Sequence, residues 1–220
     1  MDSNIAAAVI VYHKNASKIY PQRWIKKCTD SILNQTYQNF YIFELEYGDG
    51  SPSVFPSELP NHTYIKKPCI NFVEAMNYLL NLVFKEKKYQ CCFNVNLDDY
   101  YAQDRFERQI RAIKKGADIV SSNIAYVNEN DKILRYIHFS SKHIKTEAYH
   151  GNNIVAHPVV CYSRNFWMSC GKGYDINAIP AEDFVLWKRT MNRFKFIILP
   201  EFLCFHRIHS NKVCANPNNR

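Results

Sequence analysis

Two acidic side chains follow a run of apolar residues near the middle of the chain. Residues 90–95 (QCCFNV) have the composition of a buried strand, and Asn96, Leu97, Asp98 and Asp99 come directly after it. Ligands of open α/β sheets bind at the carboxyl ends of the strands, so these side chains would face a ligand. Their hard oxygen atoms suit Mg²⁺ or Mn²⁺ bridging a diphosphate. The same residues also fit a plain turn in which an aspartate caps the next helix.

A second acidic position begins a predicted helix in the C-terminal half. Asp183 follows Glu182 and precedes the apolar pair Leu186 and Trp187, so it lies at the N-terminus of helix 182–191. A carboxylate there is stabilised by the helix dipole and needs no catalytic role. The chemical alternative is a general base that takes the proton of an acceptor hydroxyl group.

Two imidazoles and a guanidinium follow the last apolar run. His206, Arg207 and His209 lie close together in the segment HRIHS. Such a group suits contact with a metal or a diphosphate from a loop that closes over a site. An exposed basic tail is the alternative interpretation.

Alternating strand and helix patterns supply the framework for these positions. Helices are predicted to begin near Pro21, Asn71 and Asp104, and strands are predicted at 6–11, 40–45, 63–66, 90–95 and 118–122. This alternation is typical of a mostly parallel, doubly wound α/β sheet with helices on both faces. Past residue 123 the pattern loosens, with strands predicted at 133–139, near His157-Pro158 and at 196–199.

Composition narrows the set of partners and the compartment. There are 28 Lys and Arg against 20 Asp and Glu, and the net charge of +8 favours anionic partners. The charges are dispersed, which disfavours a nucleic-acid-binding surface. No run approaches the ~20 apolar residues of a spanning helix, and no secretory signal follows Met1, so we expect no membrane span and a cytoplasmic protein. The eight cysteines have no paired spacing and are expected to be reduced core residues.

In their order along the chain, the motifs resemble those of the family 2 glycosyltransferases, which have the GT-A fold. The most specific match is residues 31–40 (SILNQTYQNF), similar to the family's helix and turn of the form S-hydrophobic-L-x-Q-T-Y-x-N-F. Further matches to family motifs lie at 49–51 (DGS), 75–77 (AMN), 93–99 (FNVNLDD), 173–175 (GYD), 181–183 (AED) and 207–209 (RIH). Gly48 and Asn96 stand where the family has acidic residues.

The resemblance implies an enzyme that transfers a single sugar from a nucleotide-sugar, with a UDP-sugar expected, to a glycan or protein hydroxyl group with inversion. Asp183 would be the catalytic base, and Asp98 with His209 would bind Mn²⁺ or Mg²⁺. The donor would be bound by Tyr12, Asp49, Asn77, Asn96, Leu97 and Asp98. We expect one domain over residues 1–220, with a nucleotide-sugar-binding half at about 1–123, an acceptor and catalytic-base half at about 124–211 and a polar tail at 212–220.

Three other functions fit parts of the pattern. A basic nucleic-acid-binding domain would use the positive charge and exposed tyrosines. A sugar-1-phosphate nucleotidyltransferase would need a glycine-rich basic loop after the first strand, and residues 12–15 (YHKN) do not form one. A catalytically degenerate transferase would account for Gly48 and Asn96.

Overall fold

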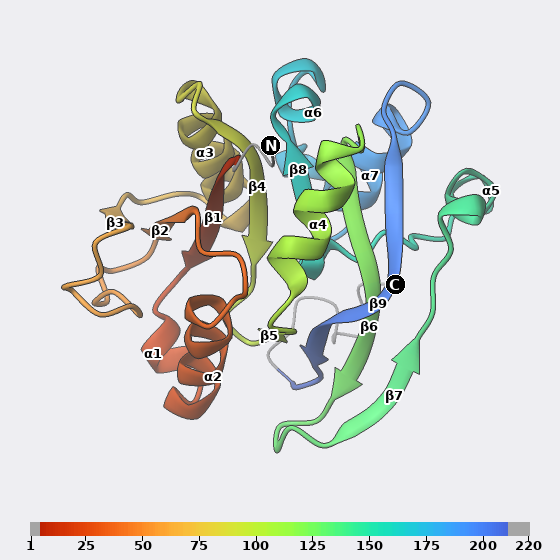
Figure 1. The fold of residues 1–220 in the computed structure, drawn as a ribbon. Helices are drawn as coiled ribbons and strands as arrows, with labels where there is room; N and C mark the ends of the chain where they lie inside the picture. Colours follow the sequence, from red (N-terminus) through yellow and green to blue (C-terminus); the bar gives the residue numbers. More distant parts are fainter. Residues whose placement is uncertain (1–4, 211–220) are drawn as a thin grey trace.

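This computed structural model describes residues 5–210, which share one nine-stranded sheet (Figure 1). The strands are β1 (Ala6–His13), β2 (Phe40–Glu46), β3 (His62–Lys66), β4 (Tyr89–Val95), β5 (Tyr100–Tyr101), β6 (Ile119–Val127), β7 (Ile133–Ile137), β8 (Cys161–Ser163) and β9 (Phe196–Arg207). The helices are α1 (Ala16–Ile19), α2 (Gln22–Leu33), α3 (Phe72–Lys85), α4 (Arg105–Lys114), α5 (Ile144–Tyr149), α6 (Arg164–Ser169) and α7 (Glu182–Thr190), with 3₁₀ turns η1 (Ser141–His143), η2 (His157–Val159) and η3 (Ile176–Ala178). The sheet order is β3-β2-β1-β4-β8-β6-β9-β5, and β7 pairs with β6.

The N-terminal part of the sheet is parallel, as the alternating pattern predicts. β1 pairs in parallel with both β2 and β4, and β2 pairs in parallel with β3. Most of β1 is buried on both faces, which is why its sequence is a continuous apolar run. The side chain of Asn71 caps α3 by accepting hydrogen bonds from the N–H groups of Val73 and Glu74. Because they run parallel to one another, β1, β2 and β4 end at a common edge of the sheet.

The C-terminal part differs from the prediction in two places. The strand expected near His157-Pro158 is wrong: those residues form η2, because proline has no N–H for a strand ladder, and β8 begins at Cys161. β9 is longer than the predicted 196–199. Its pairing with β6 breaks after Leu199 and resumes at Phe202, so Pro200 is accommodated in an irregularity and the strand continues to Arg207.

The sheet separates two apolar cores. One contains buried residues of α3, α6 and α7, and the other contains buried residues of α2 and α4. Side chains of β6 alternate between them: Ile119 lies in the α7-side core, whereas Val120 and Ile124 lie in the α2-side core. Within residues 5–210, no helix is long and apolar enough to cross a membrane. The predicted polar tail at 212–220 and Cys214 lie outside the described residues.

Candidate active site

The acidic turn after β4, residues 96–99, lies against the end of the last strand, β9. Asp98 Oδ2 lies 3.0 Å from His209 Nε2, although the two residues are 111 positions apart in the sequence. Asp98 is 8% exposed and His209 6%. The contact forms because β5, which directly follows the acidic turn, pairs antiparallel with β9. The side chains expected to share a metal are thus neighbours.

The Asp98–His209 pair fits a hard divalent cation. A carboxylate oxygen and an imidazole nitrogen are both accepted by Mn²⁺. Two ligand atoms in adjacent positions of an octahedral ion, each at about 2.1 Å, lie about 3.0 Å apart. Asp98 Oδ2 and His209 Nε2 have this separation as a hydrogen-bonded pair, and a cation bound by both would replace the shared proton. Substrate phosphate oxygens and water usually complete such a site.

Asp99 has a different environment. It is fully buried, its Oδ1 accepts the backbone N–H of Arg207 at 2.9 Å, and its Oδ2 lies 3.0 Å from His206 Nδ1. Together with Cys204, the ligand atoms of Asp99 and His206 lie within 4.8 Å of one another. These hydrogen bonds give Asp99 a structural task, since they join the acidic turn to β9. A thiol-containing set of this kind favours softer ions than Mg²⁺.

Arg207 is fully buried, and protein groups contact all three of its guanidinium nitrogens. Nε donates to the Asp98 carbonyl oxygen at 2.9 Å, and Nη1 donates to the Asn128 carbonyl oxygen at 3.0 Å. Nη2 forms a 2.6 Å ion pair with Asp131, and the guanidinium lies 4.6 Å from the centroid of the Trp24 ring. Arg207 therefore positions the backbone of the acidic turn.

Tyr12 lies near the end of β1, within a cluster of polar groups. Burial raises the pKa of Tyr12, nearby Tyr47, Glu182 and Asp98 raise it further, and a hydrogen bond with Asn94 opposes them. Asn94 is fully buried, and its Oδ1 has no hydrogen-bond partner among residues 5–210. Buried polar atoms normally have partners, so this acceptor suits a substrate group or an ordered water.

The N-terminus of α7 carries two carboxylates. Asp183 is half-buried, and its Oδ2 accepts a hydrogen bond from Asn153 Nδ2 at 2.9 Å. Glu182 is 6% exposed, and its Oε2 has no hydrogen-bond partner in the described part of the chain. Burial raises the pKa of Glu182 to about 7, and the charge of Asp183 contributes to the rise. A buried carboxylate that titrates near neutral pH is common in catalytic sites.

A short chain of polar rings lies close to Asp183. His157 Nε2 is 3.4 Å from the Tyr162 hydroxyl, which is 2.7 Å from the Tyr174 hydroxyl. Burial lowers the pKa of His157, whereas the charge of Asp183 acts in the opposite direction. The imidazole is therefore held toward its neutral form, in which it can accept a proton.

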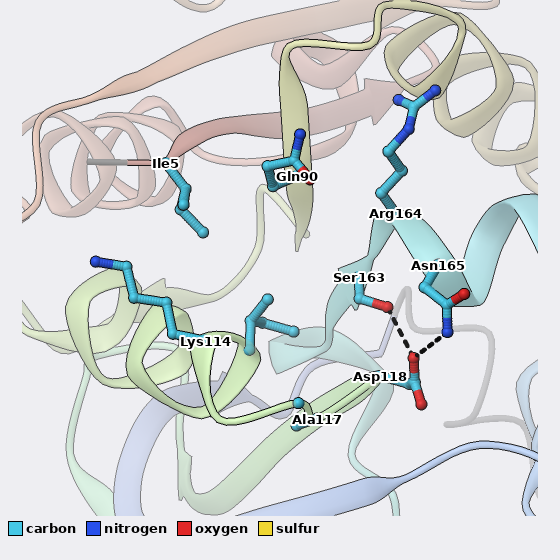
Figure 2. Close-up of a pocket in the computed structure, with 10 residues that line it drawn as sticks. Ile5, Gln90, Lys114, Ala117, Asp118, Ser163, Arg164 and Asn165 are labelled. Carbon is cyan, nitrogen blue, oxygen red and sulfur yellow. Dashed lines mark hydrogen bonds between the residues drawn. The ribbon is translucent and has the colours of Figure 1, made fainter. Parts of the chain in front are cut away.

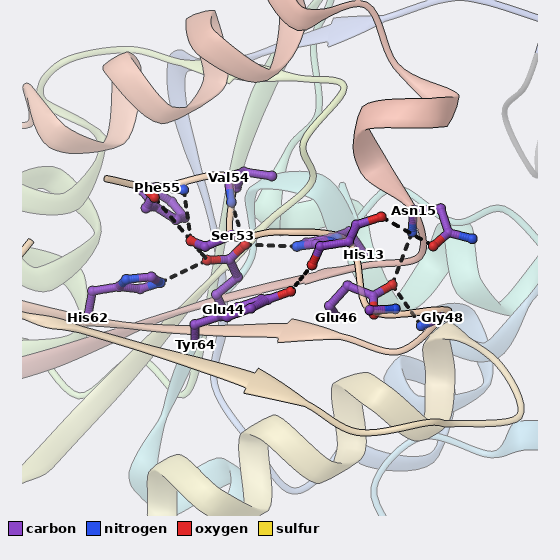
Figure 3. Close-up of polar contacts among 12 residues, drawn as sticks. His13, Asn15, Glu44, Glu46, Gly48, Ser53, Val54, Phe55, His62 and Tyr64 are labelled. Atoms are coloured by element: carbon purple, nitrogen blue, oxygen red, sulfur yellow. Dashed lines mark hydrogen bonds and ion pairs between the residues drawn. The ribbon is translucent and has the colours of Figure 1, made fainter. Parts of the chain in front are cut away.

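The loop after β2 is anchored by Glu46, which is 1% exposed (Figure 3). Its carboxylate accepts the backbone N–H groups of Gly50 at 2.7 Å, Gly48 at 2.8 Å and Asn15 at 3.2 Å. A Cβ atom at position 48 would meet Glu46 Oε1 at 2.8 Å, so a residue other than glycine would displace this carboxylate. Glu46 thus fixes the backbone between the ends of β1 and β2.

Glu44, on the same strand, is fully buried and accepts four hydrogen bonds (Figure 3). His13 Nε2 and His62 Nε2 each lie 2.8 Å from a carboxylate oxygen. The hydroxyl of Ser53 donates at 2.5 Å and the backbone N–H of Val54 at 2.8 Å. Burial alone would raise the pKa of Glu44, but these hydrogen bonds outweigh it and lower the pKa to about 2. Glu44 ties the loop to β1 and β3.

Comparison with known sequences identifies the family. The sequence model of glycosyl transferase family 2 matches residues 8–171. The chain belongs to this family. It is 23% identical over 195 residues to the Escherichia coli O-antigen biosynthesis glycosyltransferase WbnJ, covering 86% of this chain and 76% of WbnJ. It is also 23% identical over 220 residues to the uncharacterized glycosyltransferase MJ1057 of Methanocaldococcus jannaschii, covering 94% of this chain and 72% of that protein.

Solved structures confirm the predicted GT-A glycosyltransferase fold. A crystal structure of S. aureus TarS residues 1–349 in complex with UDP-GlcNAc matches with a TM-score of 0.69 and 13% identity, covering 96% of this chain. The same TarS fragment in complex with UDP matches with a TM-score of 0.65 and 14% identity, covering 93% of this chain. In both cases this chain spans 61% of the length of the TarS chain.

Several residues expected to bind the donor lie around the acidic turn of this family 2 fold. Asn96 and Leu97 belong to the turn itself, and the buried Leu97 is 3% exposed. Asp98 and Glu182 both raise the pKa of Tyr12. The N-terminus of α7, which carries Glu182, is therefore close to this region. Their roles in donor binding stay predictions.

Two other expected donor-binding residues have different surroundings. Asn77 donates to the Tyr174 carbonyl oxygen at 2.9 Å and accepts the Tyr174 N–H at 3.0 Å, so its amide holds the turn at 173–175. Asp49 is exposed and forms a 2.7 Å ion pair with Lys18. Their roles in donor binding also stay predictions.

Sequence analysis missed several polar groups of the site, namely Asn94, Asn153, His157, Glu44 and Glu46. Asn94 did carry a local signal, since it is a polar residue within the apolar run 91–95. Asn153 and His157 enter the site through the fold of the 150–157 segment, which no local pattern predicts.

Two cavities lie away from the acidic turn. One, of about 390 Å³, is lined by residues at the amino ends of β4 and β6, where Asp118 accepts hydrogen bonds from Ser163 and Asn165 (Figure 2). It lies at the opposite end of the sheet from the carboxyl edge, where ligands of such sheets bind. The other, of about 600 Å³, lies beside the 173–175 turn and is lined in part by Lys172 and Arg189.

Proposed function

We propose that this chain is a metal-dependent, inverting glycosyltransferase that moves one sugar from a nucleoside diphosphate sugar to an acceptor hydroxyl group. The observation that carries the proposal is the 3.0 Å approach of Asp98 Oδ2 to His209 Nε2 at the carboxyl edge of the sheet. The carboxylate proposed as the catalytic base, Asp183, lies in the first turn of α7 next to Glu182, which acts electrostatically on the same tyrosine as Asp98.

The donor would be bound across the ends of β1 and β4. Tyr12, Asn96 and Leu97 would contact the nucleotide and sugar, with Asp49 and Asn77 as the more distant predicted contacts. A divalent cation held by Asp98 and His209 would offset the charge that develops on the diphosphate. A uridine nucleotide is the first donor to test, because matched TarS structures contain UDP-GlcNAc or UDP.

The reaction would be a single displacement. Asp183 takes the proton of the acceptor hydroxyl group, whose oxygen bonds to the anomeric carbon. The bond from that carbon to the diphosphate oxygen breaks on the opposite side, and the nucleoside diphosphate leaves with the electron pair. Asn153 orients Asp183 through the 2.9 Å hydrogen bond to Oδ2. The acceptor in this proposal is a hydroxyl group of a glycan or a protein.

The test is nucleotide release from a panel of sugar nucleotides with Mn²⁺, Mg²⁺ or chelator. We expect metal-dependent release from one donor and its loss in Asp98→Ala. Asp183→Asn should still bind that donor, seen as a rise in melting temperature, while turnover falls by about 10²–10⁴. Asp30→Asn is the matched control, because the half-buried Asp30 carboxylate forms an ion pair with Lys26 one turn away on α2.

The outcomes separate the proposal from its rivals. If no donor raises the melting temperature with any metal, the chain is a degenerate scaffold. Release that is unaffected by chelator and by Asp98→Ala would refute the metal-dependent mechanism. A product that keeps the anomeric configuration of the donor would refute single displacement.

A further inference from the structure

Five aromatic side chains form a stripe across the C-terminal strands of the sheet. The aromatic stripe consists of Tyr100 on β5, Phe202 and Phe205 on β9, Tyr136 on β7 and His138 just after β7. The rings of Tyr100 and Phe205 are stacked with centroids 4.6 Å apart. The Phe202 ring lies 4.7 Å from that of Tyr136 and 5.0 Å from that of His138.

Strand register places this stripe on the α7 side of the sheet. Ile119 of β6 packs in the α7-side core, and alternation along β6 puts Asn123 and Ala125 on the same face. Ala125 is opposite both Phe205 and Tyr136, and Asn123 is opposite Phe202. Ile124, between them, lies in the other core, as alternation requires. Phe202, Phe205 and Tyr136 therefore lie on the face of the sheet that carries α7.

The stripe is not consumed by core packing. None of its five rings belongs to either apolar core of residues 5–210. Tyr136 is 53% exposed, His138 is exposed, and Phe202 and Phe205 are half-buried. Exposed apolar side chains that gather in one patch mark a binding surface, whereas single scattered ones are normal.

The stripe is continuous with the candidate active site. Tyr100 directly follows Asp98 and Asp99, and its ring is stacked on Phe205 with the Lys27 ammonium 4.0 Å from its centroid. Phe205 and Phe202 follow on β9, and Tyr136 lies on the outer strand β7, with β6 between these two strands. A molecule lying on these rings would extend toward the acidic turn.

We propose that the aromatic stripe binds the acceptor as a saccharide of two or more units, with pyranose rings against Phe202 and Tyr136. The inference rests on the proposed function, which supplies the sugar donor and the base. A pyranose ring presents an apolar C–H face and a rim of hydroxyl groups. Aromatic rings bury the apolar face, and the hydroxyl group of Tyr136 and the imidazole of His138 can bond the rim.

The stripe thereby selects the acceptor class without taking part in the chemical step. Phe202 and Tyr136 lie on strands that both pair with β6, so little ordering of the chain is needed when a ligand binds. A bare hydroxyl group of an unglycosylated peptide would gain nothing from them.

The test separates acceptor binding from donor chemistry. Wild-type chain, Tyr136→Ala and Phe202→Ala are applied without donor to an array of defined oligosaccharides, and the best-bound oligosaccharide is then used as acceptor in transfer assays. We expect each variant to weaken binding and raise the acceptor KM by about 3- to 10-fold, with donor KM unchanged. Tyr136→Phe keeps the ring and loses only the hydroxyl group, so it should weaken binding less than Tyr136→Ala does. Tyr149→Ala is the matched control, since Tyr149 is an 85% exposed tyrosine on α5, outside the stripe.

Each outcome decides the proposal. If the wild-type chain binds no oligosaccharide on the array, or if both alanine variants bind as it does, the acceptor assignment is wrong. A change of oligomeric state in Tyr136→Ala, measured by light scattering, would instead assign the stripe to contact between two copies of the chain. Nucleotide release by the wild type in the absence of acceptor tests the donor chemistry separately, so failure of the proposed function would be recognised as such.

Discussion

Replacing Glu44 with glutamine should destabilise the protein in a pH-dependent way. The carboxylate is fully buried and accepts hydrogen bonds from His13, His62, Ser53 and the Val54 N–H. Its pKa of about 2, compared with an ordinary value of 4.5, corresponds to about 3 kcal/mol of stability at neutral pH. Glu44→Gln should therefore lower the melting temperature by about 6–12 °C at pH 7.

The sign of the pH dependence follows from the lowered pKa. Because the folded state holds Glu44 ionised, the contribution is complete above the unfolded pKa of 4.5 and is lost as pH falls from 4.5 toward 2. The difference in unfolding free energy between wild type and Glu44→Gln should be largest at pH 7 and shrink steadily below pH 4.5.

Urea unfolding followed by tryptophan fluorescence at several pH values between 7 and 3 measures this difference. Glu58→Gln is the control, since Glu58 is exposed and bonds only the adjacent Ser57. A difference that stays constant from pH 7 to pH 3 would show that packing, and not charge, is responsible. No destabilisation at pH 7 would refute the assignment of Glu44 as the anchor of the loop.

Three further predictions concern the site. Asp131→Asn removes the ion-pair partner of the buried Arg207 Nη2. It should lower the free energy of urea unfolding by about 1–3 kcal/mol and weaken Mn²⁺ binding. An unchanged unfolding free energy and an unchanged Mn²⁺ affinity would refute the positioning role of this pair. Glu182→Gln should stabilise the chain by up to about 3 kcal/mol at pH 8 but not at pH 4.5. The folded-state pKa of Glu182 is raised from 4.5 to about 7, so the wild type loses stability as pH rises from 4.5 through 7 and the variant does not. Equal unfolding free energies of that variant and the wild type at pH 8 would contradict this. Asn153→Ala should lower kcat about tenfold with donor KM unchanged in initial-rate assays, since it frees Asp183 from the bond that orients it; an unchanged kcat would exclude that role.

The parallel framework was predictable because local pattern and tertiary role agree there. The apolar run at 6–11 is buried on both faces in β1, and Asn71 caps α3 as expected. The strand predicted near His157-Pro158 was wrong. The prediction followed the β-branched residues of this segment and gave too little weight to the N–H that proline lacks. It was too short for β9, because the continuation past Pro200 depends on pairing with β6 and not on local sequence.

The candidate site residues came from family motifs, and their roles stay predictions. No local pattern places Asp98 beside His209, since only the pairing of β5 with β9 brings them to 3.0 Å. Glu44 and Glu46 were missed for a physical reason. A carboxylate inside an apolar strand sequence has the same appearance whether it faces solvent or is buried among donors, and only the contacts of the folded chain distinguish the two.

Two buried glutamates show how the surroundings of a carboxylate decide the direction of its pKa shift. The carboxylate of Glu44 accepts four hydrogen bonds, which stabilise its charged form and lower its pKa to about 2. Glu182 is almost as buried, yet within residues 5–210 its Oε2 has no hydrogen-bond partner and its pKa is raised to about 7. A carboxylate kept at a cost in stability is a candidate for a functional role. A hydroxyl group of a bound sugar is a donor of the kind that Glu182 lacks, so substrate binding should bring the pKa of Glu182 down toward its ordinary range.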